Sequence, residues 1–174
     1  MERPYKLTID YDPDPQNPRE WDNAATMWCA HNRYNLVGGV PLDTSSYDSW
    51  DEALASIDHV VVLPLYLYDH SGITMRTTPF SCRWDSGQVG WITMSKEQIL
   101  NTYGGKRLTA KKKQQALALM RSEVETYDNY LNGEVFEYNI IDADGEIVES
   151  CGGYYDRESV VADGKQALAR WSNA

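Results

Sequence analysis

Long hydrophobic runs are missing from this chain of 174 residues. The longest apolar run is VVVLPLYLY, from Val60 to Tyr68, whereas a membrane-spanning helix needs about 20 apolar residues. The amino-terminal sequence MERPYKLTIDYD has no apolar stretch of the kind found in signal peptides. These absences predict a cytoplasmic protein with no membrane partner.

Residues that bind metals or form disulfides are also scarce. The three cysteines, Cys29, Cys82 and Cys151, are widely spaced and form no C-x-x-C pair, which argues against a disulfide framework or a zinc knuckle. The sequence has no Walker loop, no G-x-G-x-x-G, no G-x-S-x-G and no H-E-x-x-H motif. We therefore expect no metal and no cofactor.

The composition instead favours acidic residues, tyrosine and tryptophan. The chain has 26 acidic and 16 basic residues, a net charge of −10, and it has 12 Tyr and 6 Trp but only 2 Phe. Such a protein would repel phosphates, so we expect no direct DNA binding. A basic protein surface is a more suitable partner. The alternative is that the acidity serves only solubility.

The length and the hydrophobic pattern predict one α+β domain over residues 1–174. We expect a mainly antiparallel sheet of about six strands, with three to four helices that include one long helix over about 109–132. The expected strands lie in 5–10, 25–34, 59–70, 71–77, 88–95, 135–141 and 146–151. The expected short helices are 50–57, one that opens at Ser95 and ends near Gly104, and a last one broken or delayed at Gly164.

Three local signals refine this prediction. Ser49 with Glu52 and Ser95 with Gln98 have the spacing of capping boxes, in which two side chains satisfy free backbone N–H groups at a helix start. The strand over 59–70 is apolar on both faces and should lie at the centre of the sheet. Pro64 within it cannot donate a ladder hydrogen bond and predicts a bulge or an unpaired position.

The last signal is a hairpin turn. Asp144-Gly145 lies between two alternating runs, Val135 to Ile141 and Glu146 to Cys151. This dipeptide is typical of a type I′ turn. The exposed edge of this hairpin could pair with a second copy, so a homodimer is one expected assembly.

Charge is unevenly distributed along the sequence. Six basic residues and one acid lie between Lys96 and Lys113, whereas twelve acids and two basic residues lie between Met120 and Gly164. Both placements oppose the dipole of the long helix. This favours a role for the charge in binding, although a solvated helix face and an exposed hairpin would explain it as well.

The densest group of polar residues lies between Tyr66 and Gly90. It allows a cysteine-hydrolase arrangement, with Cys82 as nucleophile, His70 as base and Asp85 or Asp69 orienting the imidazole. The alternative is ordinary turn chemistry with a buried thiol. The segment also suits a recognition surface.

Three stretches carry a resemblance to a known family. TMWCAHNRYNL, VVVLPLYLYDHSGITMRTTPFSCRWDSGQVGWITMSKEQI and EVETYDNYLNGEVFEYNI resemble small acidic proteins encoded by phages, plasmids and integrated elements of bacteria. The resemblance covers most of Tyr5 to Tyr155; Arg83 departs from it, because the family more often has Pro there. The genetic setting resembles that of anti-restriction and anti-CRISPR proteins. The resemblance implies a context in the cytoplasm of a host cell and assigns no functional residue.

Two functions remain open at this stage. The first is a phage anti-defence inhibitor that mimics DNA and occupies a basic groove of a CRISPR effector or restriction enzyme. Its binding residues would be Glu123, Glu125, Asp128, Glu134, Glu137, Asp142, Asp144, Glu146 and Glu149, with Tyr127, Tyr130, Tyr138, Tyr154 and Tyr155 as anchors. The second is a small hydrolase or modifying enzyme that uses Cys82, His70 and Asp85. We favour the first, in which the protein is not an enzyme.

Overall fold

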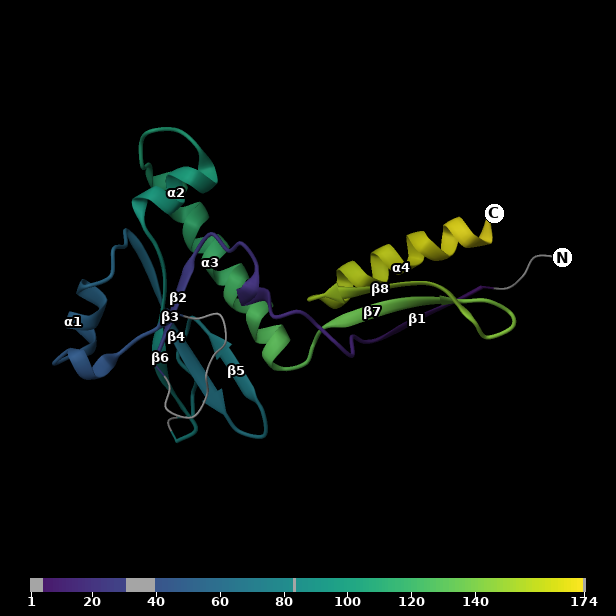
Figure 1. The fold of residues 1–174 in the computed structure, drawn as a ribbon, viewed down its shortest axis with the longest axis horizontal. Coiled ribbons are helices and arrows are strands. Elements are labelled where there is room, and N and C mark those ends of the chain that lie inside the picture. Colours follow the sequence, from purple (N-terminus) through teal and green to yellow (C-terminus); the bar gives the residue numbers. More distant parts are fainter. Residues whose placement is uncertain (1–4, 31–39, 83, 174) are drawn as a thin grey trace. The chain divides into compact units, whose positions relative to one another are not determined.

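The computed structural model describes residues 5–30, 40–82 and 84–173. It confirms the α+β class with mainly antiparallel strands and one long helix (Figure 1). The chain divides into two compact units, which we call unit 1 (Met1–Gln16 and Asn129–Ala174) and unit 2 (Asn17–Asp128). That residues 1–174 act as one domain stays a prediction.

The described residues form eight strands in two sheets, where about six strands in one sheet were expected. The strands are β1 (Lys6–Tyr11), β2 (Thr26–Cys29), β3 (Val40–Pro41), β4 (Val61–Asp69), β5 (Ile73–Arg76), β6 (Ser86–Met94), β7 (Phe136–Ile141) and β8 (Ile147–Tyr154). The helices are α1 (Trp50–Ala55), α2 (Lys96–Tyr103), α3 (Ala110–Leu131) and α4 (Arg157–Ser172), with short 3₁₀ turns at Pro18–Glu20 and Thr44–Ser46.

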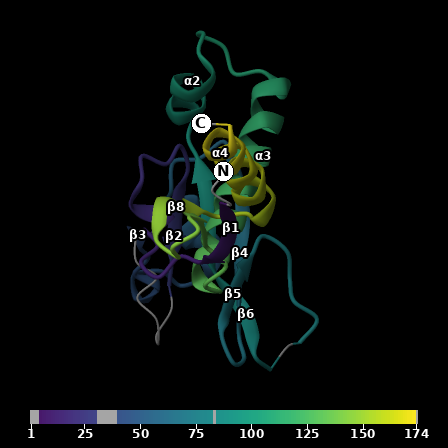
Figure 2. The ribbon, with the colours of Figure 1, turned by 90° about the vertical axis from the view of Figure 1, so that its right-hand side faces the viewer.

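Unit 1 is a three-stranded antiparallel sheet, ordered β1-β7-β8, with α4 packed on it (Figure 2). The strand β1 pairs with β7 from the other end of the chain, Lys6 opposite Ile141 and Tyr11 opposite Phe136. The core lies between sheet and helix, where Ile140, Val160 and Ala167 are fully buried. Burial of these apolar side chains is the main source of stability in this unit.

Gly164 lies in the middle of α4, which is continuous, so the expected break at Gly164 is wrong. A Cβ at this position would lie 2.8 Å from Cδ1 of Leu7 and 3.2 Å from Cβ of Tyr138. The glycine therefore serves the close approach of α4 to the sheet, and packing outweighs its low helix propensity.

The hairpin between β7 and β8 has a different turn from the expected type I′. That turn needs positive φ at two central residues, but only Gly145, at φ 86°, has it, while Asp144 does not. The Gly145 N–H bonds the Asp142 carbonyl, and the Asp142 N–H bonds the Glu146 carbonyl. This is the pattern of a type I turn followed by a left-handed glycine, which creates a bulge.

Unit 2 contains a five-stranded sheet ordered β3-β2-β6-β4-β5, antiparallel except for the β2–β3 pair. The doubly apolar β4 is an interior strand, paired with β5 and β6, but β6 and not β4 lies at the centre. The register of β4 and β6 shifts between Leu65 and Tyr66, one residue beyond Pro64, and the extra residue is Val89 of β6. Pro64 itself stays in register opposite Trp91, so the bulge lies near the predicted position but on the partner strand. Gly90 of β6 lies against Trp28, where an added Cβ would be 1.8 Å from the carbonyl oxygen.

The helices of unit 2 begin much as expected. Ser95 and Gln98 form the predicted capping box at α2. At α1 only half of the expected box is present: Ser49 accepts a hydrogen bond from the Glu52 N–H, but the Glu52 carboxylate accepts from the Asp48 N–H instead of that of Ser49. None of the helices among the described residues has the length and apolar character that crossing a bilayer would require.

Candidate functional site

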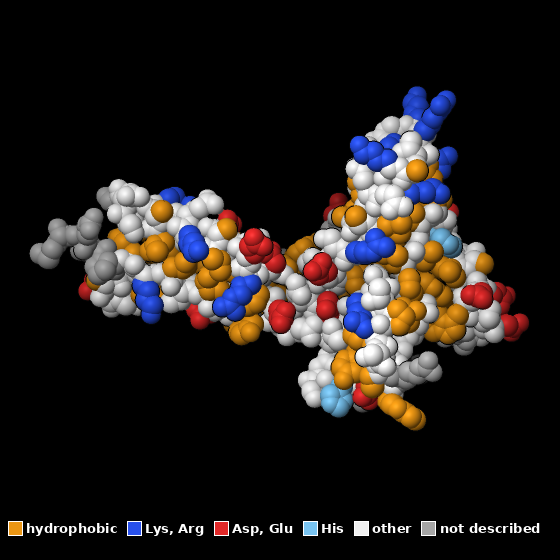
Figure 3. All heavy atoms as spheres, turned by 180° about the vertical axis from the view of Figure 1, so that it is seen from behind, with side chains coloured by type: hydrophobic (Ala, Val, Ile, Leu, Met, Phe, Trp, Pro, Cys, Tyr) orange, Lys and Arg blue, Asp and Glu red, His pale blue; other side chains and the backbone are white. Residues whose placement is uncertain are grey.

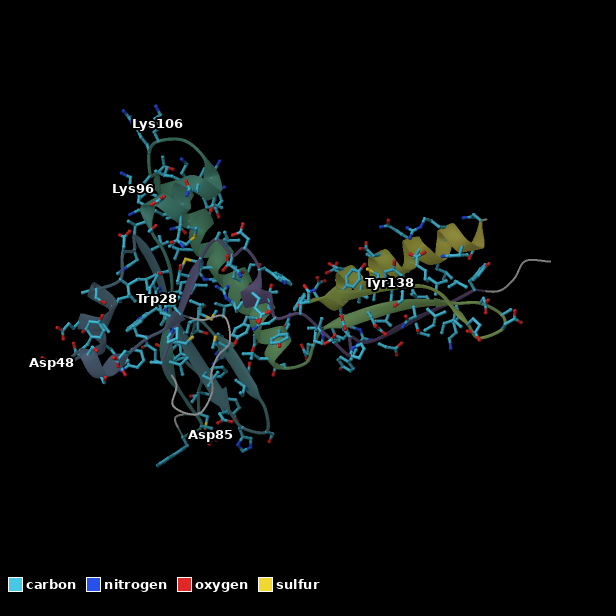
Figure 4. The ribbon with its side chains drawn as sticks, viewed as in Figure 1. Trp28, Asp48, Asp85, Lys96, Lys106 and Tyr138 are labelled. Carbon is cyan, nitrogen blue, oxygen red and sulfur yellow. The ribbon has the colours of Figure 1, made fainter. Side chains whose placement is uncertain are left out.

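The loop residues proposed for catalysis come together at one end of the unit 2 sheet. His70 follows β4, and Cys82 and Asp85 lie in the connection from β5 to β6. One carboxylate oxygen of Asp85, Oδ2, lies 3.5 Å from Sγ of Cys82 and 3.4 Å from Nδ1 of His70. The sequence therefore correctly grouped these residues, and Figure 4 labels Asp85 near the loops at this end.

Their order differs from that of a nucleophile, a base and an orienting acid. In such a triad the imidazole lies between the nucleophile and the carboxylate, because it must accept the thiol proton. Here Asp85 lies between Cys82 and His70, and Cys82 makes its hydrogen bond to the carboxylate. The His70 side chain is 64% exposed and its Nδ1 lies near Asp85, so the imidazole does not lie between the thiol and the carboxylate.

The same loops are held by backbone and ring contacts. The Asp69 N–H bonds the Asp85 carbonyl at 2.8 Å. The ring of Phe80 stacks on Tyr68, and the guanidinium of Arg76 lies 3.7 Å above the centre of the Phe80 ring. These contacts stabilise the loop conformation. A structural role in the turns is the alternative to catalysis that the sequence also allowed.

A hollow of about 510 Å³ lies beside this cluster. Its wall includes two tryptophans and two carboxylates: Trp50, Trp84, Asp69 and Asp85. Trp84 is 95% exposed, which is unusual for a side chain of this size. The hollow is open and mainly polar in its lining, unlike the apolar pocket of a typical small-molecule enzyme.

Two acids of the predicted binding set have structural roles in unit 2. Glu123 of α3 accepts hydrogen bonds from Arg19 Nη1 at 2.8 Å and from the N–H groups of Ala24 and Ala25. Asp128 Oδ1 accepts from Thr74 Oγ1 at 2.6 Å and from the Met75 N–H at 2.7 Å. These carboxylates fix α3 to the rest of unit 2 and are not free to mimic phosphates.

The predicted tyrosine anchors are also partly internal. Tyr127 is only 2% exposed and Tyr138 only 6%, so neither can anchor a partner in the folded chain. Tyr130, Tyr154 and Tyr155 keep part of their surface exposed. Burial and the neighbouring Asp12 and Tyr130 raise the pKa of Tyr155, which therefore stays a neutral phenol.

Unit 1 uses some of its acids internally and leaves others at the surface. Glu149 accepts from Tyr138, Arg170 and Trp171, and these bonds lower its pKa. The remaining members of the predicted set in this unit are Glu134, Glu137, Asp142, Asp144 and Glu146. Of these, Glu137 bonds Asn139 and Asp142 closes the hairpin turn, while Glu134, Asp144 and Glu146 are exposed.

The pairing of β1 with β7 adds acids that sequence reasoning missed. Asp10 lies opposite Glu137 on the neighbouring strand, and Asp12 accepts from the Gly153 N–H. Unit 1 has 13 acidic and 5 basic residues, a net charge of −8, whereas unit 2 has 13 and 11, a net charge of −2. No local signal assigns the amino-terminal acids to the carboxyl-terminal hairpin, because the pairing is long-range.

Comparisons with family models, curated proteins and solved structures give no match for this chain. The resemblance to acidic phage proteins therefore stays a prediction. Over residues 5–30, 40–82 and 84–173, no three metal-binding side chains gather into a site.

Proposed function

We propose that this protein is an anti-defence inhibitor that binds a basic, nucleic-acid-binding surface of a host nuclease through the exposed acidic residues of unit 1. The observation that carries the proposal is the net charge of −8 on this unit of the chain. Such a charge attracts a basic partner over about 8–10 Å at physiological salt and speeds association.

The carboxylates available for this contact are those that the fold leaves exposed. They include Asp10, Asp14, Glu134, Asp144, Glu146, Glu158 and Asp163, whereas the exposed Asp156 is engaged as the cap of α4. Each one at the rim of an interface contributes little, but together they favour a positive partner and repel a negative one. Asp163 is the least free of them, because it accepts a hydrogen bond from Tyr154.

Unit 1 also has exposed apolar side chains that can supply contact area. Tyr11 is 66% exposed and stacks on Phe136 at 5.3 Å, so its ring is already oriented. Ile147 at the start of β8 is 59% exposed. Oriented aromatic side chains of this kind are typical binding anchors.

The test is protection of DNA in a bacterial host that has a restriction system or a CRISPR system. The first variant reverses four exposed acids of unit 1: Glu134→Lys, Asp144→Lys, Glu146→Lys and Glu158→Lys. The matched control reverses four exposed acids of unit 2: Glu20→Lys, Asp22→Lys, Asp48→Lys and Asp58→Lys. Both variants change the net charge equally.

We expect the parent and the unit 2 variant to raise the transformation efficiency of a targeted plasmid and the unit 1 variant to lose this effect. Circular dichroism of each variant checks that the fold is retained. The proposal is wrong if the parent protects against neither system, or if folded unit 1 and unit 2 variants behave alike.

The second candidate function is a thiol enzyme, which is favoured only by the meeting of Cys82 and His70 at Asp85. Labelling with iodoacetamide separates the two functions. Burial raises the pKa of Cys29 to about 12, against a smaller opposite effect of Arg19, so Cys29 should react slowest. Without catalysis, exposed Cys151 should react faster than half-buried Cys82. A faster Cys82 that slows in His70→Ala would support the enzyme.

A further inference from the structure

A group of basic side chains covers one end of unit 2, where α2 ends and α3 begins. Figure 3 shows Lys and Arg side chains gathered over this end, and Figure 4 labels Lys96 and Lys106 there. We call this surface the basic tip and define it by five exposed residues: Lys96, Lys106, Arg107, Lys111 and Lys113.

The connection that carries the basic tip has a fixed backbone. Gly104 and Gly105 both have positive φ, 70° and 77°, which turns the chain sharply after α2. Nζ of Lys112 then donates to the Gly104 carbonyl and, at 3.1 Å, to the Arg107 carbonyl. Lys112, a sixth basic residue, thus holds the turn, so the other five cations are presented on an ordered surface and not on a loose tail.

The charges of the basic tip are not neutralised within the described part of the chain. None of the five residues forms an ion pair there, whereas Arg19 and Arg170 do, with Glu123 and Glu149. Lys111 and Lys113 lie in the first turn of α3, which has no acidic residue. Cations at a helix amino terminus oppose the helix dipole, which is unfavourable for the helix.

We propose that the basic tip binds the phosphate backbone of a nucleic acid. Five unpaired cations on an ordered turn match a polyanion with closely spaced charges. A membrane surface fits less well, because an interfacial segment inserts large apolar side chains. The exposed large apolar residues of the described chain are Tyr11, Trp21, Val40, Trp50, Trp84 and Ile147, none of which lies in 96–113.

This inference goes beyond the proposed function and does not depend on it. It also modifies the expectation that the acidic chain would not bind DNA directly. That expectation follows from the net charge of −10, most of which belongs to unit 1. Unit 2 has a net charge of only −2, and at physiological salt a phosphate responds mainly to charges within about 8 Å.

The experiment measures fluorescence anisotropy of a labelled DNA duplex and of a labelled single strand with the full chain, across a salt series. The tip variant is Lys106→Glu with Lys113→Glu. The matched control is Lys6→Glu with Lys165→Glu, two exposed lysines of unit 1, so both variants lower the net charge by the same amount. Lys113→Glu places an acid in the first turn of α3, which favours folding.

We expect the parent and the control to bind with equal affinity and the tip variant to bind more weakly. The slope of log affinity against log salt should fall by about 2 in the tip variant, about 1 for each lost phosphate contact. Two results would overturn the proposal: no binding by the parent at low salt, or equal loss in both variants. A third is salt-sensitive self-association through the tip, seen by sedimentation without DNA, which would assign the surface to a second copy.

Discussion

The two units have the same number of acidic residues but differ in the number of basic residues. Unit 1 has 13 acids against 5 basic residues, and unit 2 has 13 against 11. Glu123 and Asp128 of α3 are bonded inside unit 2, but both units also have many exposed carboxylates, so the difference in net charge comes from the basic residues. A run of acids in a sequence is therefore not one functional feature: the run from Met120 to Gly164 crosses the boundary between the units and changes its role there.

The clearest example of a structural acid in unit 2 is Glu123, which forms a buried ion pair with Arg19. The side chains are 3% and 10% exposed, and Nη1 to Oε2 measures 2.8 Å. Arg19 also donates to the Ala25 carbonyl at 3.1 Å, while its Nε is buried without a partner. The pair links the start of unit 2 to the middle of α3. Because the burial of two charges costs solvation free energy, the main role of the pair is to fix the arrangement of these segments, and its net contribution to stability is small.

The largest expected effect follows from breaking this pair. Glu123→Ala leaves the Arg19 charge buried and removes the acceptor of two backbone N–H groups. We expect the free energy of unfolding to fall by about 3–5 kcal/mol, measured by urea denaturation. Glu125→Ala, an exposed neighbour in the same helix, should change it by no more than about 0.5 kcal/mol. Equal effects would remove the distinction between structural and surface acids.

The sequence predicted the elements of the fold better than their assembly. Local signals located β4, the capping box of α2 and the long helix α3, because hydrophobic period and capping chemistry are properties of neighbouring residues. They could not divide the strands between two sheets, since the β1–β7 pairing joins distant residues and depends on packing against α4. The turn at Asp144-Gly145 was misassigned because the dipeptide suits two turn types.

The candidate site was predictable to a similar degree. Nearness along the chain was enough to group Cys82 with Asp85, and the β4–β5 hairpin brings His70 close. The order of contacts was not predictable, because it depends on side-chain directions in irregular loops. Glu123 and Glu125 are likewise indistinguishable in the sequence, and only the position of Arg19 separates them.

A smaller effect is expected in unit 1, where α4 approaches the sheet at Gly164. Gly164→Ala gains about 1 kcal/mol of helix propensity but forces a methyl group within 2.8 Å of Leu7 and 3.2 Å of Tyr138. Overpacking costs about 1–3 kcal/mol, so we expect a net loss of about 1 kcal/mol by urea denaturation. The combined variant Leu7→Ala with Gly164→Ala should lose less than the sum of the single changes. A gain in stability for Gly164→Ala alone would contradict close packing here.

The smallest expected effect is on the pH dependence of stability, and it concerns Glu149, the most fully hydrogen-bonded acid of the predicted binding set in unit 1. The Tyr138 hydroxyl donates to Glu149 at 2.7 Å and, with Trp171 and Arg170, holds the pKa of Glu149 below its usual value, while the same bond raises the pKa of Tyr138. Because the pKa of Glu149 is lower in the folded chain than in the unfolded chain, its carboxylate stabilises the fold at pH values above the unfolded-state pKa of about 4.5. This stabilisation is lost as the pH falls through the folded-state pKa.

Thermal unfolding of the parent and of Glu149→Gln should therefore differ most near neutral pH, with the parent more stable, and converge as the pH is lowered below about 4.5. Glu146→Gln is the matched control, because this side chain is exposed in the same hairpin, and its unfolding should follow the parent throughout. If Glu149→Gln also follows the parent at every pH, Glu149 belongs with the surface acids of unit 1.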